Sequence, residues 1–190
     1  MQLRERQKAE THAQILAAAS DLFAELGYEA TTTRAVAARA GVAVGTLFAH
    51  FPDKPALVSA LLEERIGAAM GEALATLPPG GLVAELVHVA ETLYRSYDER
   101  PDLARVLVQH ALFAAGSDEQ RAALEAWVTG RVREAMASGA LRPVDPKLAF
   151  VHYFSCYFAI LVGGLRGEIA PKARGPLLGA LLDHFHGGKP

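Results

Sequence analysis

The segment best suited to bind a ligand runs from Ala30 to Lys54 and reads ATTTRAVAARAGVAVGTLFAHFPDK. Its apolar pattern predicts two short helices, one that a threonine run can cap and one over Val44–His50. A short turn around Gly41 separates them, and glycine adopts the positive φ of such a turn easily. This spacing is typical of a helix-turn-helix, in which the second helix can enter the major groove of DNA. A plain helical hairpin with a glycine turn would show the same pattern, so the spacing alone leaves both interpretations open.

Catalytic and metal-binding candidates are few. The single cysteine, Cys156, excludes an internal disulfide framework and a cysteine-rich metal site. His152 lies one helical turn from Cys156, and this pair could in principle bind a metal ion or act as nucleophile and base. A buried apolar helix disfavours a thiolate, however, and the chain lacks a glycine-rich phosphate loop, a G-x-S-x-G motif and an H-E-x-x-H motif. We therefore expect a protein that is not an enzyme and holds no cofactor or metal.

Composition sets the wider limits. The 190 residues are 51% apolar, and 19 Lys and Arg against 21 Asp and Glu give a net charge of −2. Such a chain can bury a core in one or two domains, and its charge balance gives no overall reason to expect nucleic acid. The first residues lack the apolar core of a secretory signal. Leu148–Leu165 is uncharged and barely long enough to span a membrane, but we interpret it as a buried helix and expect a cytoplasmic protein.

Helical periodicity covers almost the whole chain and predicts an all-α fold of about nine helices. The first runs from Ile15 to Leu26, and Asp53 can cap a fourth, longer one. The Pro78–Gly81 run is the clearest break, and five longer apolar stripes follow it. We expect a helix-turn-helix domain over residues 1–54, a connecting helix over about 53–77, and a larger helical domain over 78–190.

The run from Ile15 to Leu62 resembles the N-terminal DNA-binding domain of the TetR (tetracycline-repressor-like) family of bacterial transcriptional regulators. The resemblance rests on LFAELGYEATT and RAVAARAGVAVGTLFAHFPDKPALV, in the order and spacing of that domain. The region beyond it resembles the family's effector-binding and dimerisation domain in architecture only. The resemblance implies a homodimeric repressor that binds an inverted-repeat operator in double-stranded DNA and is released by a small effector.

Matched position by position, the resemblance implies DNA contacts for Thr33, Arg34, Val44, Thr46, Phe48, His50 and Lys54. Thr33 and Lys54 would bind phosphates, and Arg34 would reach a phosphate or a base edge. Phe48 stands where the family usually has tyrosine, so only ring packing on a sugar or a thymine methyl group remains. Because Ala43, Val44 and Gly45 have no hydrogen-bonding side chains, we expect base reading to depend on Arg34, thymine methyl groups and DNA shape.

Several of these positions also have a structural interpretation that the sequence leaves open. Thr33 can be a helix cap, Phe48 a residue of the local core and Lys54 an ordinary solvated lysine. His50 falls at a position that often contacts phosphate, and a basic arm over Arg4–Lys8 can add a backbone or minor-groove contact.

The candidates for an effector pocket are aromatic or histidine side chains on the later helices: Tyr94, His110, Phe113, Trp127, Tyr153 and Tyr157. Such a lining favours a small hydrophobic effector that is uncharged or weakly polar. Most aromatic residues of this kind belong to the core, and a histidine on an apolar stripe, such as His110, is more often buried than ligand-binding.

For the homodimer, the resemblance indicates pairing of the last two long helices with those of a second subunit. We expect the seam to use the small face of the first of these helices, which contains His152, Ser155, Cys156, Ala159 and Gly163, and the stripe over Leu177–Phe185. The alternative is that both faces pack inside one subunit.

Two other classes of protein stay open. One is a helical small-molecule binder in which the helix-turn-helix is only a structural hairpin, and the other is a helical enzyme centred on His152 and Cys156. The residues Thr33, Arg34, His50 and Lys54 discriminate, because a protein with no DNA partner has no reason to align them on one face.

Overall fold

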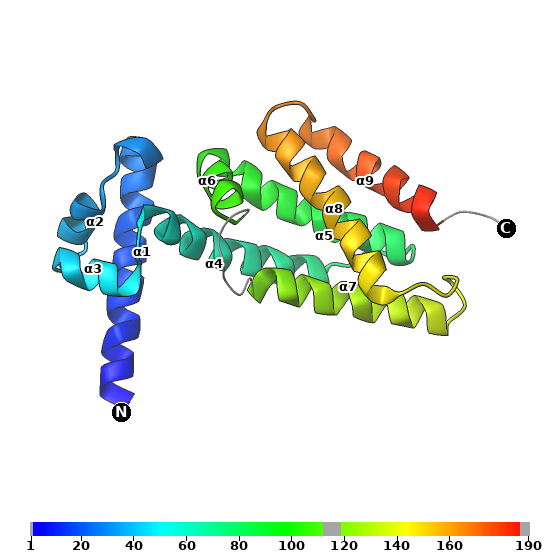
Figure 1. The fold of residues 1–190 in the computed structure, drawn as a ribbon, viewed down its shortest axis with the longest axis horizontal. Helices are drawn as coiled ribbons and strands as arrows, with labels where there is room; N and C mark the ends of the chain where they lie inside the picture. The colour runs from blue at the N-terminus through cyan, green and yellow to red at the C-terminus, as the bar shows by residue number, and fades with distance from the viewer. Residues whose placement is uncertain (1, 112–118, 187–190) are drawn as a thin grey trace. The chain divides into compact units, whose positions relative to one another are not determined.

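The computed structural model describes residues 2–111 and 119–186, and every regular element in these ranges is an α-helix (Figure 1). The helices are α1 (Gln2–Ala30), α2 (Thr33–Arg39), α3 (Val44–His50), α4 (Lys54–Ala75), α5 (Leu82–Asp98), α6 (Pro101–Ala111), α7 (Glu119–Ala137), α8 (Pro146–Leu165) and α9 (Pro171–His186). The predicted all-α fold of about nine helices is confirmed for this part of the chain.

Contacts divide the chain into two compact units. One contains α1–α3, the first part of α4 and nearly all of α6, and the other contains the rest of α4 with α5 and α7–α9. The division falls inside α4, between Glu64 and Arg65. The expected boundaries at residues 54 and 78 stay a prediction.

Helix α1 is longer than its apolar stripe indicated, because it begins at Gln2 rather than near Ile15. The basic residues expected as an arm, Arg4–Lys8, are therefore helical, and they are exposed. Arg6 pairs with Glu10 one turn later, with 3.0 Å between Nε and Oε1. Gly27 interrupts the helix with φ 80° and ψ 166°, at the position where the sequence predicted its end.

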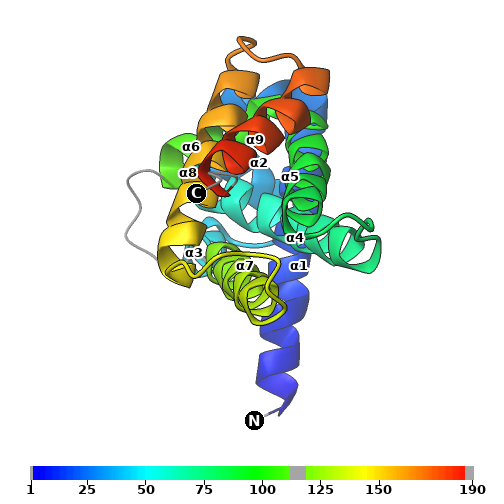
Figure 2. The same ribbon diagram turned by 90° about the vertical axis from the view of Figure 1, so that its right-hand side faces the viewer.

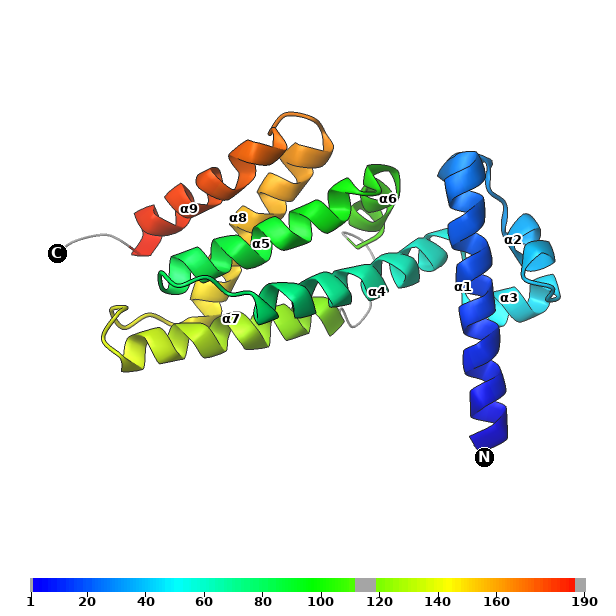
Figure 3. The ribbon, with the colours of Figure 1, turned by 180° about the vertical axis from the view of Figure 1, so that it is seen from behind.

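Helices α2 and α3 are the predicted short pair, and they pack beside α1 (Figure 3). The Ala35 N–H donates to Thr32 Oγ1 at 3.1 Å, which caps α2, and Gly41 has φ 68° in the turn. Inward-facing side chains from all three helices are buried almost completely, among them Ile15, Phe23, Val36, Ala37 and Leu47. This small core fixes α3 against the other two helices.

The second unit is a bundle of long helices in which α5 packs on α9, and α8 contacts both α7 and α9 (Figure 2). Within the described residues, α8 is the one helix long and apolar enough to cross a membrane by length and composition, with a mean hydropathy of 1.7. Its buried residues, which include Phe150, Tyr153 and Leu161, pack inside the bundle, as in the core helix of a globular domain.

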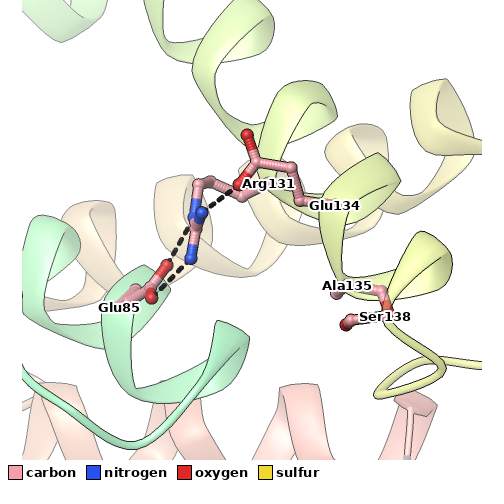
Figure 4. A network of polar contacts seen from close by, with 5 residues as sticks. All are labelled: Glu85, Arg131, Glu134, Ala135 and Ser138. Atoms are coloured by element: carbon pink, nitrogen blue, oxygen red, sulfur yellow. Dashed lines mark hydrogen bonds and ion pairs between the residues drawn. The ribbon is translucent and has the colours of Figure 1, made fainter.

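An ion pair joins α5 to α7. Glu85 is 8% exposed and accepts hydrogen bonds from Nε and Nη2 of Arg131, both at 2.7 Å (Figure 4). Arg131 also pairs with Glu134 on its own helix. The bidentate bond to Glu85 raises the pKa of Arg131 and compensates the carboxylate for the water it loses on burial.

A second ion pair joins α9 to α5. Arg174 is 3% exposed, and its Nη1 donates to both carboxylate oxygens of Asp98 at 2.9 Å. A Cβ atom on Gly164 would lie 2.5 Å from the Arg174 guanidinium carbon, so a larger residue there would have to displace the arginine side chain.

Candidate nucleic-acid interface

Helix α3 presents an apolar face to solvent. Leu47 points inward and is completely buried, whereas Phe48 is 46% exposed. Gly45 and Ala49 are also exposed. Gly45 lies three residues before Phe48 and four before Ala49, so all three lie on one side of the helix. Phe48 therefore does not belong to the local core. The predicted groove residues Val44 and Thr46 are half-buried.

The three threonines before α2 have separate roles. The buried hydroxyl of Thr31 donates to the Gly27 carbonyl at 2.8 Å and lies 3.1 Å from that of Leu22, so it holds the end of α1. Thr32 is the helix cap, which leaves Thr33 as the first residue of α2, half-buried and not the cap. Arg34 follows it and is exposed.

Lys54 contacts backbone carbonyls, which the sequence did not predict. Its Nζ donates to the carbonyls of Tyr28 and Thr31 at 2.8 and 3.1 Å, with a longer contact of 3.4 Å to that of Glu29. It also lies 4.1 Å from the centre of the Tyr28 ring. An ammonium group has three donors, so Lys54 is not an ordinary solvated lysine but a link between the end of α1 and the start of α4. Its phosphate contact stays a prediction. To bind a phosphate, the ammonium group would have to share or replace one of these bonds.

His50, the last residue of α3, is brought together with a histidine that the sequence did not single out. The ring centres of His12 and His50 are 5.8 Å apart, and His12 lies 4.6 Å from the ring of Phe51. Burial lowers the pKa of His50, and the positive charges of His12 and Lys8 lower it further. His12 could have been found from its place one turn before Ile15, at the edge of the stripe that faces α2 and α3.

Three predicted pocket residues form a tyrosine cluster between α5 and α8. The rings of Tyr94 and Tyr157 stack with centres 5.1 Å apart, and Tyr153 lies beside Tyr157. The Tyr94 hydroxyl donates to the Tyr157 carbonyl at 3.0 Å, and that of Tyr153 donates to the Leu86 carbonyl at 3.1 Å. All three are buried, and burial raises the pKa of each phenol, so they are core residues that stay neutral.

Of the other three predicted pocket residues, the structure describes the side chain of one. Trp127 is half-buried on α7. Phe113 and the side chain of His110 lie outside the described residues. A depression of about 290 Å³ between α4 and α5 contains none of the predicted residues. Most of its lining residues are charged or polar in type, and they are Arg65, Ala68, Ala69, Glu72, Thr92, Arg95, Ser96 and Glu99.

The predicted seam residues divide between an outer and an inner face. On α9, Leu177 and Leu181 are 40% and 39% exposed, whereas their neighbours Leu178 and Leu182 are completely buried. Gly163 of α8 is buried too, because a Cβ there would lie 2.7 Å from Ile169 of the same chain. Half of the leucine stripe and this glycine therefore pack within one subunit. Uncharged residues that remain exposed on α8 are Leu148, Val151, Ser155 and Ala159.

The alternative catalytic pair has little chemical support. Cys156 Sγ lies 3.9 Å from His152 Nε2, and burial raises the pKa of the thiol, which lowers its thiolate fraction at neutral pH. Among the residues that the structure describes, no three potential metal ligands lie together.

The first unit has a short helix, α3, that follows a glycine turn, and a helical bundle comes after it. This is the arrangement of a helix-turn-helix protein. The model of the bacterial regulatory proteins of the tetR family matches residues 15–61. The chain is 31% identical over 174 residues to the HTH-type transcriptional repressor Rv1474c of Mycobacterium tuberculosis, a match that covers 90% of this chain and 88% of that protein. The chain belongs to the TetR family of transcriptional regulators, and its relatives have a non-enzymatic role.

Two further similarities agree with this assignment. The chain is 32% identical over 96 residues to an uncharacterized HTH-type transcriptional regulator, YvkB of Bacillus subtilis, and spans half the length of that relative. The fold is similar to that of a TetR transcriptional regulator from Rhodococcus sp. RHA1, with a TM-score of 0.71 at 20% identity, over 94% of this chain and 96% of the other.

Proposed function

We propose that this protein is a ligand-responsive repressor that binds an inverted-repeat operator as a homodimer. The observation that carries the proposal is the exposed face of α3, whose opposite face is fixed by the fully buried Leu47 and by packing against α2. A helix held in this way can enter the major groove without rearrangement. The DNA-contact residues would be Thr33, Arg34, Val44, Thr46, Phe48, His50 and Lys54.

The homodimer would form through the exposed faces of α8 and α9. Both helices leave large apolar side chains in solvent, among them Val151 at 56% and Leu177 at 40% exposure. Because isolated subunits bury such side chains where they can, two adjacent helices with exposed apolar faces support a self-complementary seam. The two-fold axis would present two α3 helices to half-sites about 34 Å apart, or a multiple of that distance.

The effector would be a small hydrophobic molecule bound in the helical bundle. The hydroxyls of Tyr94 and Tyr153 already donate to backbone carbonyls, and both rings are buried in the core. An effector would therefore contact their ring faces only by displacing the side chains that now cover them. Helix α4 is continuous from Lys54 to Ala75, and the division between the units falls within it. An effector that favours one position of α4 would therefore act on the α1–α3 unit through a covalent connection and release the DNA. The DNA partner implies a cytoplasmic protein.

Selection of bound duplexes from a random library tests the proposal. The salt concentration should be about 150 mM, because phosphate contacts make the affinity strongly salt-dependent. Enrichment of an inverted repeat is the expected result. Binding that shows no sequence preference, or no binding at all, would favour a helical small-molecule binder instead.

A further inference from the structure

We propose that the depression between α4 and α5 binds a small zwitterion, a molecule with one carboxylate and one ammonium group. The carboxylate binds Arg95 and the hydroxyl of Ser96, and the ammonium group binds Glu72. None of the three clustered tyrosines lines this depression, so it is a second, polar ligand site. Its ligand would bind whether or not DNA is present.

Two polar contacts between α4 and α5 set the register of these helices (Figure 3). Arg65 of α4 pairs with Glu99, the residue after α5. Thr76, the residue after α4, has its Oγ1 3.0 Å from Nε2 of His88 on α5. The two helices are therefore antiparallel, and the two contacts are about 16 Å apart along α4. The middle of α4 lies opposite the middle of α5, and the depression lies between them.

The floor of the depression contains a hydroxyl group that is available to a ligand. Ala68 and Ala69 provide the α4 side, and Thr92 and Ser96 of α5 are 4% and 7% exposed. The Thr92 hydroxyl is bonded to a backbone carbonyl and to Nη2 of Arg95, both at 3.0 Å. The Ser96 hydroxyl has no hydrogen-bond partner among the residues that the structure describes. Because a hydroxyl in a buried residue is more stable when it is bonded, a polar group of a ligand is favoured there.

The rim of the depression has one cation and one anion that are not paired. Arg95 is exposed, and its one hydrogen bond goes to a neutral hydroxyl. Glu72 is exposed on α4, and within the described parts of the chain neither residue has an ion-pair partner. The other two charged residues of the lining, Arg65 and Glu99, neutralise each other. A ligand with a single charge would match only one unpaired group, whereas a zwitterion matches both.

The size and the shape of the two charged groups limit the ligand further. A volume of about 290 Å³ is close to the lower limit of small-molecule sites, so the ligand has about the size of an amino acid. The planar guanidinium of Arg95 can hold a carboxylate through two parallel hydrogen bonds. Ala68 and Ala69 can cover the carbon chain between the two charges of the ligand.

Titration calorimetry of the full chain with ω-amino acids, from β-alanine to 6-aminohexanoate, tests the charge requirement. The series moves the ammonium group away from the carboxylate one methylene group at a time, so the affinity should be greatest at one length. Pentanoate and pentylamine are the controls with a single charge. Each should bind at least about fivefold more weakly than the best zwitterion, because one of the two charged contacts is lost.

Substitutions test the assigned contacts. Arg95→Gln and Glu72→Gln should each weaken binding of the best zwitterion at least about fivefold. Ala68→Leu fills the depression from an exposed position on α4 and should abolish binding. Arg133→Gln and Glu64→Gln are the matched controls, because they remove exposed charges that do not line the depression, and both should bind like the wild type.

Hydrogen exchange locates the bound zwitterion. A ligand that connects α4 with α5 should slow the exchange of amides in residues 68–75 of α4 and leave those of α2 unchanged. No binding of any zwitterion in the series, equal binding of the singly charged controls, or wild-type affinity in Arg95→Gln and Glu72→Gln would overturn the inference. None of these results affects the selection of an inverted repeat, so the proposed function would stand.

Discussion

Replacement of Lys54 by methionine should destabilise the α1–α3 unit in the absence of DNA. Methionine keeps the apolar stem but removes the ammonium group, so the carbonyls of Tyr28 and Thr31 lose bonds of 2.8 and 3.1 Å. A bond to a charged group contributes about 1.5–3 kcal/mol when buried, and these carbonyls are part-buried, so about 1 kcal/mol each is reasonable. The ring contact with Tyr28 adds about 0.5 kcal/mol. The expected loss is therefore about 2–3 kcal/mol.

Native-state hydrogen exchange of the amides in α2 and the last turn of α1 measures this loss directly. Lys172→Met is the matched control, because Lys172 is exposed at the start of α9. Protection should fall in Lys54→Met and stay unchanged in the control. Equal protection in Lys54→Met and the wild type would refute the structural role assigned to the ammonium group.

The salt dependence of DNA binding separates this role from a phosphate contact. If Lys54 also binds a phosphate, its loss should reduce the slope of log affinity against log salt by about 0.9 for each contact. If Lys54 acts only by holding α1 and α4 together, the variant should bind more weakly with an unchanged slope.

Three further predictions follow from other contacts. Glu85→Gln should lower the free energy of unfolding of the bundle by about 1–3 kcal/mol, because it leaves the Arg131 guanidinium without its bidentate partner; an unchanged urea midpoint by tryptophan fluorescence would contradict this. The lowered pKa of His50 means that the folded unit binds fewer protons than the unfolded chain below the ordinary value of about 6.5, so stability should fall as the pH drops through that range. A phosphate contact would raise the pKa of His50. The DNA affinity of the wild type should therefore rise as the pH drops through the same range, whereas that of His50→Gln should stay flat. Leu181→Glu should convert the dimer to a monomer in sedimentation experiments, whereas Leu74→Glu, at 37% rather than 39% exposure, should not; equal masses would argue against the α8–α9 seam.

Three helix ends were predictable because single residues determine them. Gly27 adopts the positive φ that ended the first stripe, and Asp53 Oδ1 accepts from the Ala56 N–H at 2.8 Å at the start of α4. Helix α3 has its predicted bounds, since Pro52 disfavours a helical residue before it. The helix-turn-helix therefore followed from local rules.

Features that depend on distant parts of the chain could not be predicted in the same way. Lys54 bonds to carbonyls more than 20 residues earlier, and no local pattern in the sequence brings those groups together. Leu177 and Leu178 look equivalent in a leucine stripe, yet one is 40% exposed and the other is buried, because the position of the neighbouring helices decides which side is the core. The helical start of α1 has no apolar signal, since its first turns are exposed.

The central claim, that two subunits bind two half-sites, is tested most directly by sedimentation of the protein with the selected duplex. The comparison is a duplex with one scrambled half-site, at about 150 mM salt. One dimer, or a pair of dimers, should bind the intact duplex, and binding to the scrambled one should be at least about tenfold weaker. A single subunit on the intact duplex, or equal affinity for both duplexes, would contradict it.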